Sequence, residues 1–247
     1  MGLFASVIHI RTPEPQGLRG ALDAVLLEHG FRPHLVVFVP PAGPTAIAEF
    51  EAVRSNHPSY LLSTGGATWL TVIEASFAVE GTPWLSELAV ELGKRLDAYT
   101  LSLMVHDDDV LFYNLDRAGQ PLDGYNSSPQ YFEKERLAEG EIEGQRHTPT
   151  AFRPLVADEG SLRRLQEVLD RGWWRAHDSG QLDDEGVPTD DDSFPLGSEG
   201  ERMAEVGDIL GIPGDVTPYP YAEWLTSTAI TWPAFELVAY APKREAG

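Results

Sequence analysis

The chain has 247 residues, of which 18 are Lys or Arg and 39 are Asp or Glu, so its formal net charge is −21. A surface this negative repels phosphate backbones and anionic lipids, which argues against nucleic-acid and membrane partners and favours a basic protein partner. The absence of cysteine excludes disulfides, thiol catalysis and thiolate metal sites. Because no apolar run approaches the roughly 20 residues that span a bilayer, and no basic leader precedes the first apolar stretch, the sequence predicts a cytoplasmic protein.

Apolar spacing in the first 115 residues predicts alternating strands and helices. The expected strands lie at residues 3–10, 35–39, 60–63, 69–77, 100–105 and 110–115. The last two strands flank an Asp-rich turn and therefore form a hairpin. The expected helices lie at 15–28, ended by Gly30, at 47–53, and after Thr82, which is the expected N-cap of a helix with Trp84, Leu88 and Leu92 on one face.

The same region contains a possible internal repeat. Leu18, Leu22 and Leu26 correspond to Trp84, Leu88 and Leu92 at an offset of 66 residues, and the strand at 35–39 corresponds to 101–105 at the same offset. Two such strand–helix–strand units suggest a ferredoxin-like arrangement, although any two units of this kind share the apolar rhythm.

Beyond residue 135 the chain is rich in loops. Helices are expected around 161–169, opened by Ser161, and around 203–210, ended by Gly211, with a terminal strand at 235–241. The predicted fold class is α+β, with a mixed or antiparallel sheet, helices on one face and a helical C-terminal portion. The expected division is a sheet domain over 1–135 and a C-terminal portion over 136–247, which alternatively pack as a single domain.

An acidic loop extends from residue 178 to residue 201 and contains nine Asp or Glu residues and no Lys or Arg. Its glycines lack the preceding acids of an EF-hand, so a solvated face or a docking surface for a basic protein is the favoured interpretation. The aspartates expected to bind such a partner are Asp183, Asp184, Asp190, Asp191 and Asp192.

The densest group of candidate catalytic residues is the turn His106–Asp109. Clustered carboxylates beside a histidine are typical of divalent-cation sites, which makes Asp107 and Asp109 candidate metal ligands and His106 a candidate catalytic residue. Asp residues also stabilise hairpin turns through their own backbone, and this structural role is the favoured one. No other cofactor is indicated, because phosphate-binding loops, dinucleotide fingerprints and nucleophile elbows are missing from the sequence.

The segment 107–132 combines Asp-Asp-Asp-Val-Leu-Phe-Tyr-Asn-Leu with Tyr-Asn-Ser-Ser-Pro-Gln-Tyr-Phe. It resembles a group of uncharacterised bacterial proteins with the pattern D-x-D-V-x-x-Y-x-L followed by Y-N-S-x-P-x-Y-F. The resemblance implies no activity. It implies that residues 125–132 act as a unit, in which Tyr125 and Asn126 are candidate binding residues, a short helix starts near Pro129, and Tyr131 and Phe132 plug the sheet edge.

The favoured function is therefore a non-enzymatic binding or regulatory protein, of an inhibitor or immunity type, that uses its acidic surface. The alternative is a metal-dependent hydrolase centred on His106, Asp107 and Asp109, in which a metal-bound water attacks the substrate. A third hypothesis is a housekeeping domain with a small-molecule pocket. The sequence leaves the oligomeric state open.

Overall fold

The computed structural model describes residues 5–12, 15–39, 52, 57–63, 68–75, 82–133, 135, 137–171, 199–212 and 235–243. The five aspartates of the acidic loop named above lie outside the described residues. The helix predicted at 47–53 also lies outside them, apart from Ala52.

The fold is α+β, as the sequence predicts. The strands are β1 (Ala5–Arg11), β2 (Phe31–Val39), β3 (Ser59–Ser63), β4 (Leu70–Glu74), β5 (Tyr99–His106), β6 (Val110–Arg117), β7 (Gln120–Asn126) and β8 (Phe235–Pro242). The helices are α1 (Leu18–Glu28), α3 (Leu85–Leu96), α4 (Glu139–Glu143), α5 (Glu159–Asp170) and α7 (Glu199–Leu210), with 3-10 turns at Pro15–Gly17 and Pro149–Phe152. None of the helices in the described part of the chain has the length and apolar character needed to cross a membrane.

Hydrogen bonds join the eight strands in the order β2-β8-β3-β4-β1-β5-β6-β7. Strand β4 is antiparallel to both β1 and β3, and β8 is antiparallel to both β3 and β2. It follows that β1 and β2 are parallel, which requires a crossover, and α1 supplies it. The segments β1–α1–β2 and β4–α3–β5 are thus both strand–helix–strand units, as expected, while their origin by duplication stays a prediction.

The chain divides into two compact units. Unit 1 comprises Met1–Ala5, Leu103–Asn114 and Leu122–Pro218, and unit 2 comprises Ser6–Ser102, Leu115–Pro121 and Tyr219–Gly247. The tip of the β5–β6 hairpin thus belongs to the same unit as α5 and α7. The expected division near residue 135, with a single domain as the alternative, stays a prediction.

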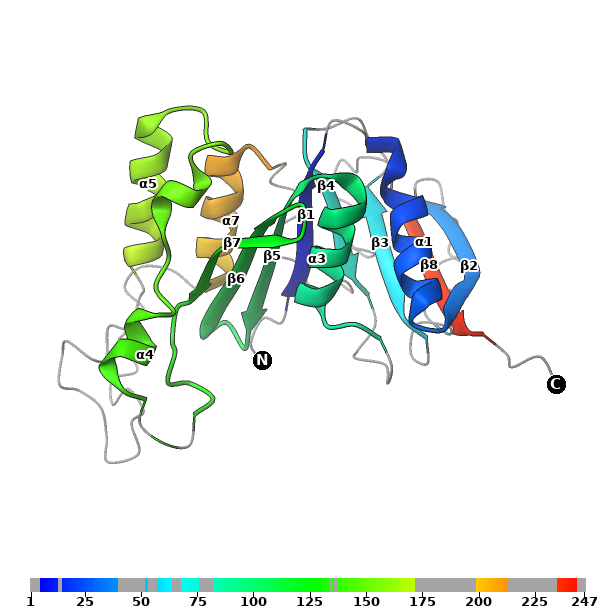
Figure 1. Ribbon diagram of the computed structural model, residues 1–247, viewed down its shortest axis with the longest axis horizontal. Helices are drawn as coiled ribbons and strands as arrows, with labels where there is room; N and C mark the ends of the chain where they lie inside the picture. Colours follow the sequence, from blue (N-terminus) through cyan, green and yellow to red (C-terminus); the bar gives the residue numbers. More distant parts are fainter. Residues whose placement is uncertain are drawn as a thin grey trace. The chain divides into compact units, whose positions relative to one another are not determined.

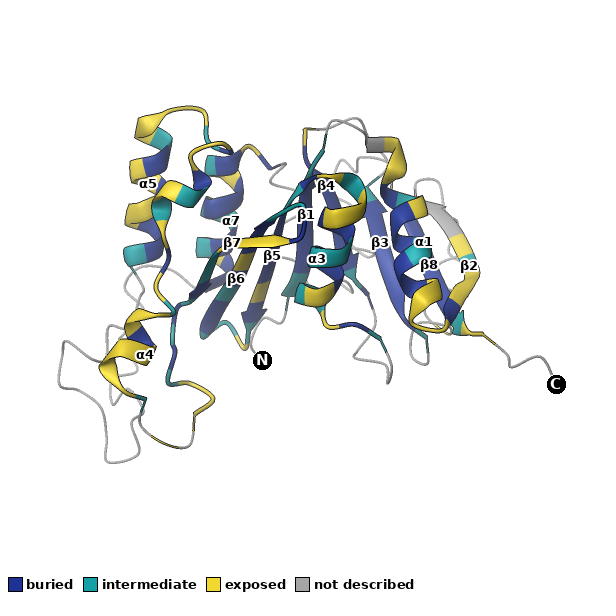
Figure 2. Ribbon diagram, viewed as in Figure 1, coloured by how far each residue is buried: buried dark blue, intermediate teal, exposed yellow. Residues whose placement is uncertain are grey.

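In unit 2, α1 and α3 cover one face of the sheet, as Figure 1 shows. Their apolar stripes pack on alternate residues of the strands, and the burial colours of Figure 2 show both helices with one buried and one exposed side. The core of this layer contains Ile8, Ile10, Leu22, Val25, Leu26, Leu62, Val72, Leu88, Leu92 and Val238. The expectation of two helices on one face is confirmed.

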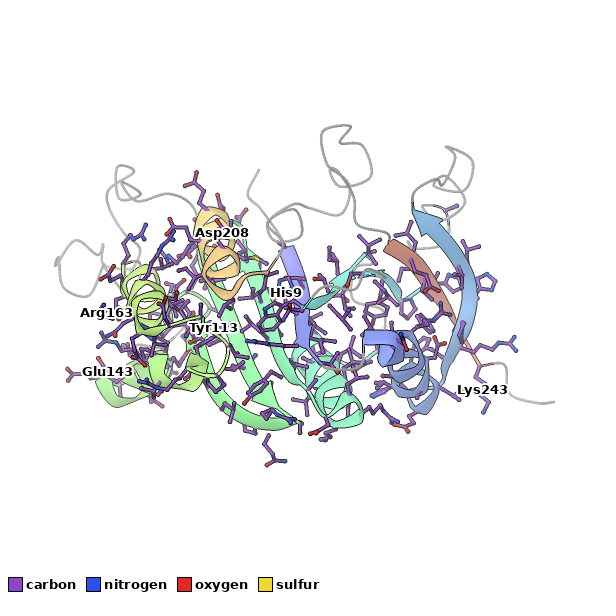
Figure 3. The ribbon with its side chains drawn as sticks, turned by 90° about the horizontal axis from the view of Figure 1, so that it is seen from above. His9, Tyr113, Glu143, Arg163, Asp208 and Lys243 are labelled. Carbon is purple, nitrogen blue, oxygen red and sulfur yellow. The ribbon has the colours of Figure 1, made fainter. Side chains whose placement is uncertain are left out.

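The other face of the same strands is also buried. Val7 and Leu61 are at most 2% exposed, and so are two polar side chains, His9 and Thr71. His9 Nδ1 lies 3.1 Å from Thr71 Oγ1, and Figure 3 labels His9 on β1. Burial lowers the pKa of His9 to about 3, so the imidazole is neutral at pH 7.

The predicted end of α1 is confirmed, whereas α3 begins later than predicted. Gly30 ends α1 as predicted, because its φ of +85° is a conformation that glycine adopts without strain. Helix α3 begins at Leu85 and not near Thr82, and its N-cap is Trp84, whose amide donates to Glu87 Oε2 at 3.0 Å. Trp84, which was expected on the same face as Leu88 and Leu92, is 73% exposed while those two are buried, because an N-cap residue stands before the helical stripe begins.

Two helical glycines of unit 2 should respond oppositely to alanine. A Cβ at Gly20 of α1 meets no atom within 4 Å, whereas one at Gly93 of α3 lies 3.2 Å from Thr100 Oγ1 and 3.3 Å from the Gly119 amide nitrogen. We expect Gly20→Ala to raise the free energy of unfolding by about 0.5–1 kcal/mol through helix propensity. We expect Gly93→Ala to lower it by about 1–3 kcal/mol through overpacking. Urea denaturation of both variants measures this, and a stabilised Gly93→Ala would contradict the tight contact.

In unit 1, α5 packs on α7, and Leu165 and Val168 of α5 and Met203 and Val206 of α7 are at most 1% exposed. Helix α5 begins two residues earlier than predicted, because the Asp158 side chain accepts a bond from the Ser161 amide at 2.7 Å and so caps the helix. Tyr113 of β6 lies between its strand and α5, while Arg163 points away on the outer side of that helix (Figure 3).

Candidate functional site

The Asp-rich segment is the turn of the β5–β6 hairpin. The Asp109 amide donates to the His106 carbonyl at 3.0 Å, and both central residues, Asp107 (φ +52°) and Asp108 (φ +65°), are left-handed. This is the type I′ geometry that a two-residue hairpin loop favours, and Asp tolerates it better than most residues. The predicted Asp-rich hairpin turn is therefore confirmed.

Asp108 links this turn to the start of α7. Its Oδ1 accepts a hydrogen bond from the Gly200 amide at 2.9 Å, and its carbonyl accepts one from the Glu199 amide at 3.4 Å. An acidic side chain at this place satisfies amides that have no partner within the helix and complements the helix dipole. Asp108 thus acts as the N-terminal cap of a helix more than 90 residues away.

We expect Asp108→Ala to lower the free energy of unfolding by about 1–3 kcal/mol, since it removes a cap and leaves alanine in a left-handed conformation. Asp107→Ala is the matched control, because Asp107 shares the left-handed turn without bonding to α7. The amount by which Asp108→Ala lowers the free energy of unfolding beyond Asp107→Ala is the contribution of the cap. Hydrogen exchange should show faster exchange of the first-turn amides of α7 in Asp108→Ala alone; equal exchange in both variants would disprove the capping role.

Next to the turn lies an exposed group of side chains that we call the hairpin patch. Its members are Met104, His106, Phe112, Tyr131 and Phe132. Phe132 lies edge-to-face with His106, with ring centroids 4.9 Å apart, and stacks on Phe112 at 5.9 Å. Met104, Tyr131 and Phe132 are 41%, 42% and 54% exposed, whereas His106 and Phe112 are partly buried. The patch therefore presents the rings of Tyr131 and Phe132 to solvent.

Carboxylates border this patch. The Tyr131 hydroxyl donates to Asp109 Oδ2 at 3.0 Å, and loss of hydration together with this bond raises the pKa of Tyr131 to about 12. Segment 103–135 carries seven acidic and two basic residues. Among the described residues, no Lys or Arg forms an ion pair with Asp107 or Asp109.

The segment after β7 is anchored largely by its own polar side chains. Asn126 Oδ1 accepts from the Ser128 amide at 3.0 Å, and Ser127 Oγ accepts from the Leu111 amide at 2.9 Å. The short helix expected near Pro129 is a turn instead, with the Tyr131 amide bonded to the Ser128 carbonyl at 3.1 Å. These bonds hold Tyr131 and Phe132 against the hairpin.

Two further predicted site residues, Tyr125 and Asn126, make contacts within unit 1. Tyr125 is buried, stacks on Tyr113 with centroids 5.3 Å apart, and donates its hydroxyl to the Leu169 carbonyl at 2.8 Å. The Asn126 amide group donates to Gln145 Oε1 at 2.9 Å. Both side chains are thus engaged within the chain, and their binding role stays a prediction.

The side chains around the predicted metal site have different partners. Asp108 points to α7, Asp109 is bonded to Tyr131, and His106 packs against the rings of Tyr131 and Phe132. Within the described ranges, no group of three or more His, Asp or Glu side chains is placed to hold a metal ion. The hydrolase hypothesis stays a prediction.

Sequence reasoning missed a buried ion pair in unit 1. Glu199 Oε1 and Arg202 Nη1 of α7 lie 2.7 Å apart, with side chains 5% and 10% exposed. Burial raises the pKa of Glu199 despite the neighbouring guanidinium. The sequence shows that Glu199 and Arg202 are three residues apart, as helical ion pairs often are. It does not show that the pair is buried, because the burial depends on packing against the hairpin.

Comparison of the chain with protein-family models, with curated proteins and with solved structures gave no match. The resemblance of segment 107–132 to a bacterial group therefore stays a prediction.

Proposed function

We propose that this chain is a non-catalytic binding or regulatory protein that acts in the cytoplasm on a basic protein partner. The contact surface in this proposal is the hairpin patch with its border of acidic residues. The observation that carries the proposal is the exposure of Tyr131 and Phe132 beside Asp107 and Asp109 in a chain of net charge −21.

Two physical arguments support this proposal. Exposed aromatic side chains are enriched at the energetic centres of protein interfaces, where they bury large areas at a small entropic cost. Surrounding negative charge accelerates encounter with a positive partner and makes binding sensitive to salt. The lack of cysteine is compatible with a reducing compartment.

The test is affinity capture from the lysate of the organism that encodes the chain, at low and at high salt. The wild type is compared with a Tyr131→Ala/Phe132→Ala variant and with Trp84→Ala, which removes an aromatic side chain that is 73% exposed in unit 2. We expect a basic protein that the wild type and Trp84→Ala retain at low salt and release at high salt, and that the patch variant does not retain.

Capture that is the same for all three proteins would contradict the proposal. The circular dichroism of each variant provides the folding control. Since Tyr131 and Phe132 are about half exposed and lie outside the helices and strands, the patch variant is expected to keep the wild-type spectrum.

A further inference from the structure

We infer that the hairpin patch recognises an arginine side chain of its partner, with the guanidinium on the exposed ring of Phe132 and bonded to the Asp109 carboxylate. This inference rests on the proposed function, because it specifies the chemistry of the contact that the binding protein makes. It is argued from ring geometry, from charge and from an arginine site that the chain itself contains.

The ring of Phe132 is positioned by its neighbours. His106 meets it edge-to-face at 4.9 Å and Phe112 stacks on it at 5.9 Å, while more than half of the side chain remains exposed. Tyr131 lies 4.8 Å from the same ring and is fixed to Asp109 through its hydroxyl. An aromatic face and a carboxylate are therefore held next to each other.

Unit 2 contains an arginine that is bound by an aromatic ring and a carboxylate of this kind. In unit 2 the guanidinium of Arg117 lies 5.2 Å from the ring centroid of Tyr99 and donates to Asp97 Oδ1 at 2.6 Å. One arginine there engages a ring and a carboxylate together. At the hairpin patch, the described residues provide the ring and the carboxylate but place no cation over Tyr131 or Phe132.

Charge and shape favour arginine over lysine in this position. A guanidinium is planar, stacks on aromatic faces and directs several N–H donors at a carboxylate, whereas an ammonium is a compact, strongly hydrated charge. The acidic excess of segment 103–135 attracts any cation. Because this attraction is the same for arginine and lysine, a preference for arginine must come from the ring of Phe132 and from Asp109.

The experiment measures binding of fluorescein-labelled nona-arginine and nona-lysine to the full chain by fluorescence anisotropy at physiological salt. The two probes carry the same charge, so general attraction to the acidic chain affects both. We expect nona-arginine to bind about fivefold or more tightly than nona-lysine, as a cation–π contact of about 1 kcal/mol gives. Phe132→Ala and Asp109→Asn should each remove this preference, and Trp84→Ala should retain it.

Equal affinity of the two probes for the wild type, or a preference that Phe132→Ala leaves intact, would overturn the inference. If the preference is missing while the patch variant still loses its cellular partner, the arginine assignment fails and the proposed function stands. If the preference is present while capture from lysate does not depend on the patch, the proposed function fails.

Discussion

Replacing Arg202 by Met is expected to lower the free energy of unfolding by about 3–5 kcal/mol at pH 7, because the change leaves the Glu199 carboxylate buried without its cation. The two side chains are only 5% and 10% exposed, so water compensates little of the loss. The measurement is urea denaturation of wild type and variant, with hydrogen exchange on α7 to locate the effect.

The pH dependence of this loss has a definite sign. Burial raises the pKa of Glu199 above its unfolded value, and removing Arg202 raises it further, so the folded variant binds a proton that the unfolded chain releases. The loss is then largest above the folded pKa and shrinks as the pH falls towards 4.

The controls separate the buried charge from the lost packing. In Glu199→Gln/Arg202→Met no carboxylate is left buried, so this double variant should be more stable than Arg202→Met alone. Arg164→Met changes an exposed arginine of α5 and should have little effect. A double variant as unstable as the single one would assign the loss to packing.

Much of the fold follows from local patterns in the sequence. Apolar alternation located β1, β5 and β6, and the positive φ of Gly30 and Gly211 explains why helices end there as expected. These features depend on residues close together in the chain, where steric preference and periodicity act directly.

The edge strands were less predictable. Strand β7 was not expected, because Pro121 and Gly124 interrupt its pattern, and β2 begins at Phe31, before Pro33, where a register shift occurs. Both strands lie at the ends of the sheet order, where one side of the backbone needs no ladder partner and proline is tolerated.

The candidate site was only partly predictable for a different reason. The Asp-rich turn and the importance of Tyr131 and Phe132 were readable from segment 107–132. The capping of α7 by Asp108 joins residues 92 positions apart, and the packing of Phe112 on Phe132 follows from strand pairing. Contacts of this range depend on the tertiary fold, and no local pattern encodes them.

The second large effect expected concerns two groups of unit 2, the buried His9 and the partly buried Glu74, whose pH dependences oppose each other. The pKa of His9 is lowered to about 3 and that of Glu74 is raised to about 7, both because burial disfavours the charged form. Between pH 6.5 and 4.5, unfolding makes His9 take up a proton and Glu74 release one. As the pH falls through this window, His9 destabilises the fold and Glu74 stabilises it, so the two contributions cancel.

Single substitutions should expose each contribution. In Glu74→Gln only His9 remains, and the free energy of unfolding should fall by about 2–3 kcal/mol from pH 6.5 to pH 4.5, at about 1.4 kcal/mol per pH unit for a complete shift. In His9→Gln only Glu74 remains, and stability should rise by a similar amount over the same window. Glutamine does not titrate and is close in size to both His and Glu, so each replacement removes a titrating group with little change in volume.

Urea denaturation at half-unit pH intervals measures these slopes, and the double variant His9→Gln/Glu74→Gln is the decisive control. Because it lacks both groups, its slope should match that of the wild type, where the two cancel. Other titrating groups, such as Asp116, whose pKa burial also raises, contribute equally to all four proteins and leave the differences unchanged. Single variants with the wild-type slope would show that the pKa values of His9 and Glu74 are the same in the folded protein as in the unfolded chain.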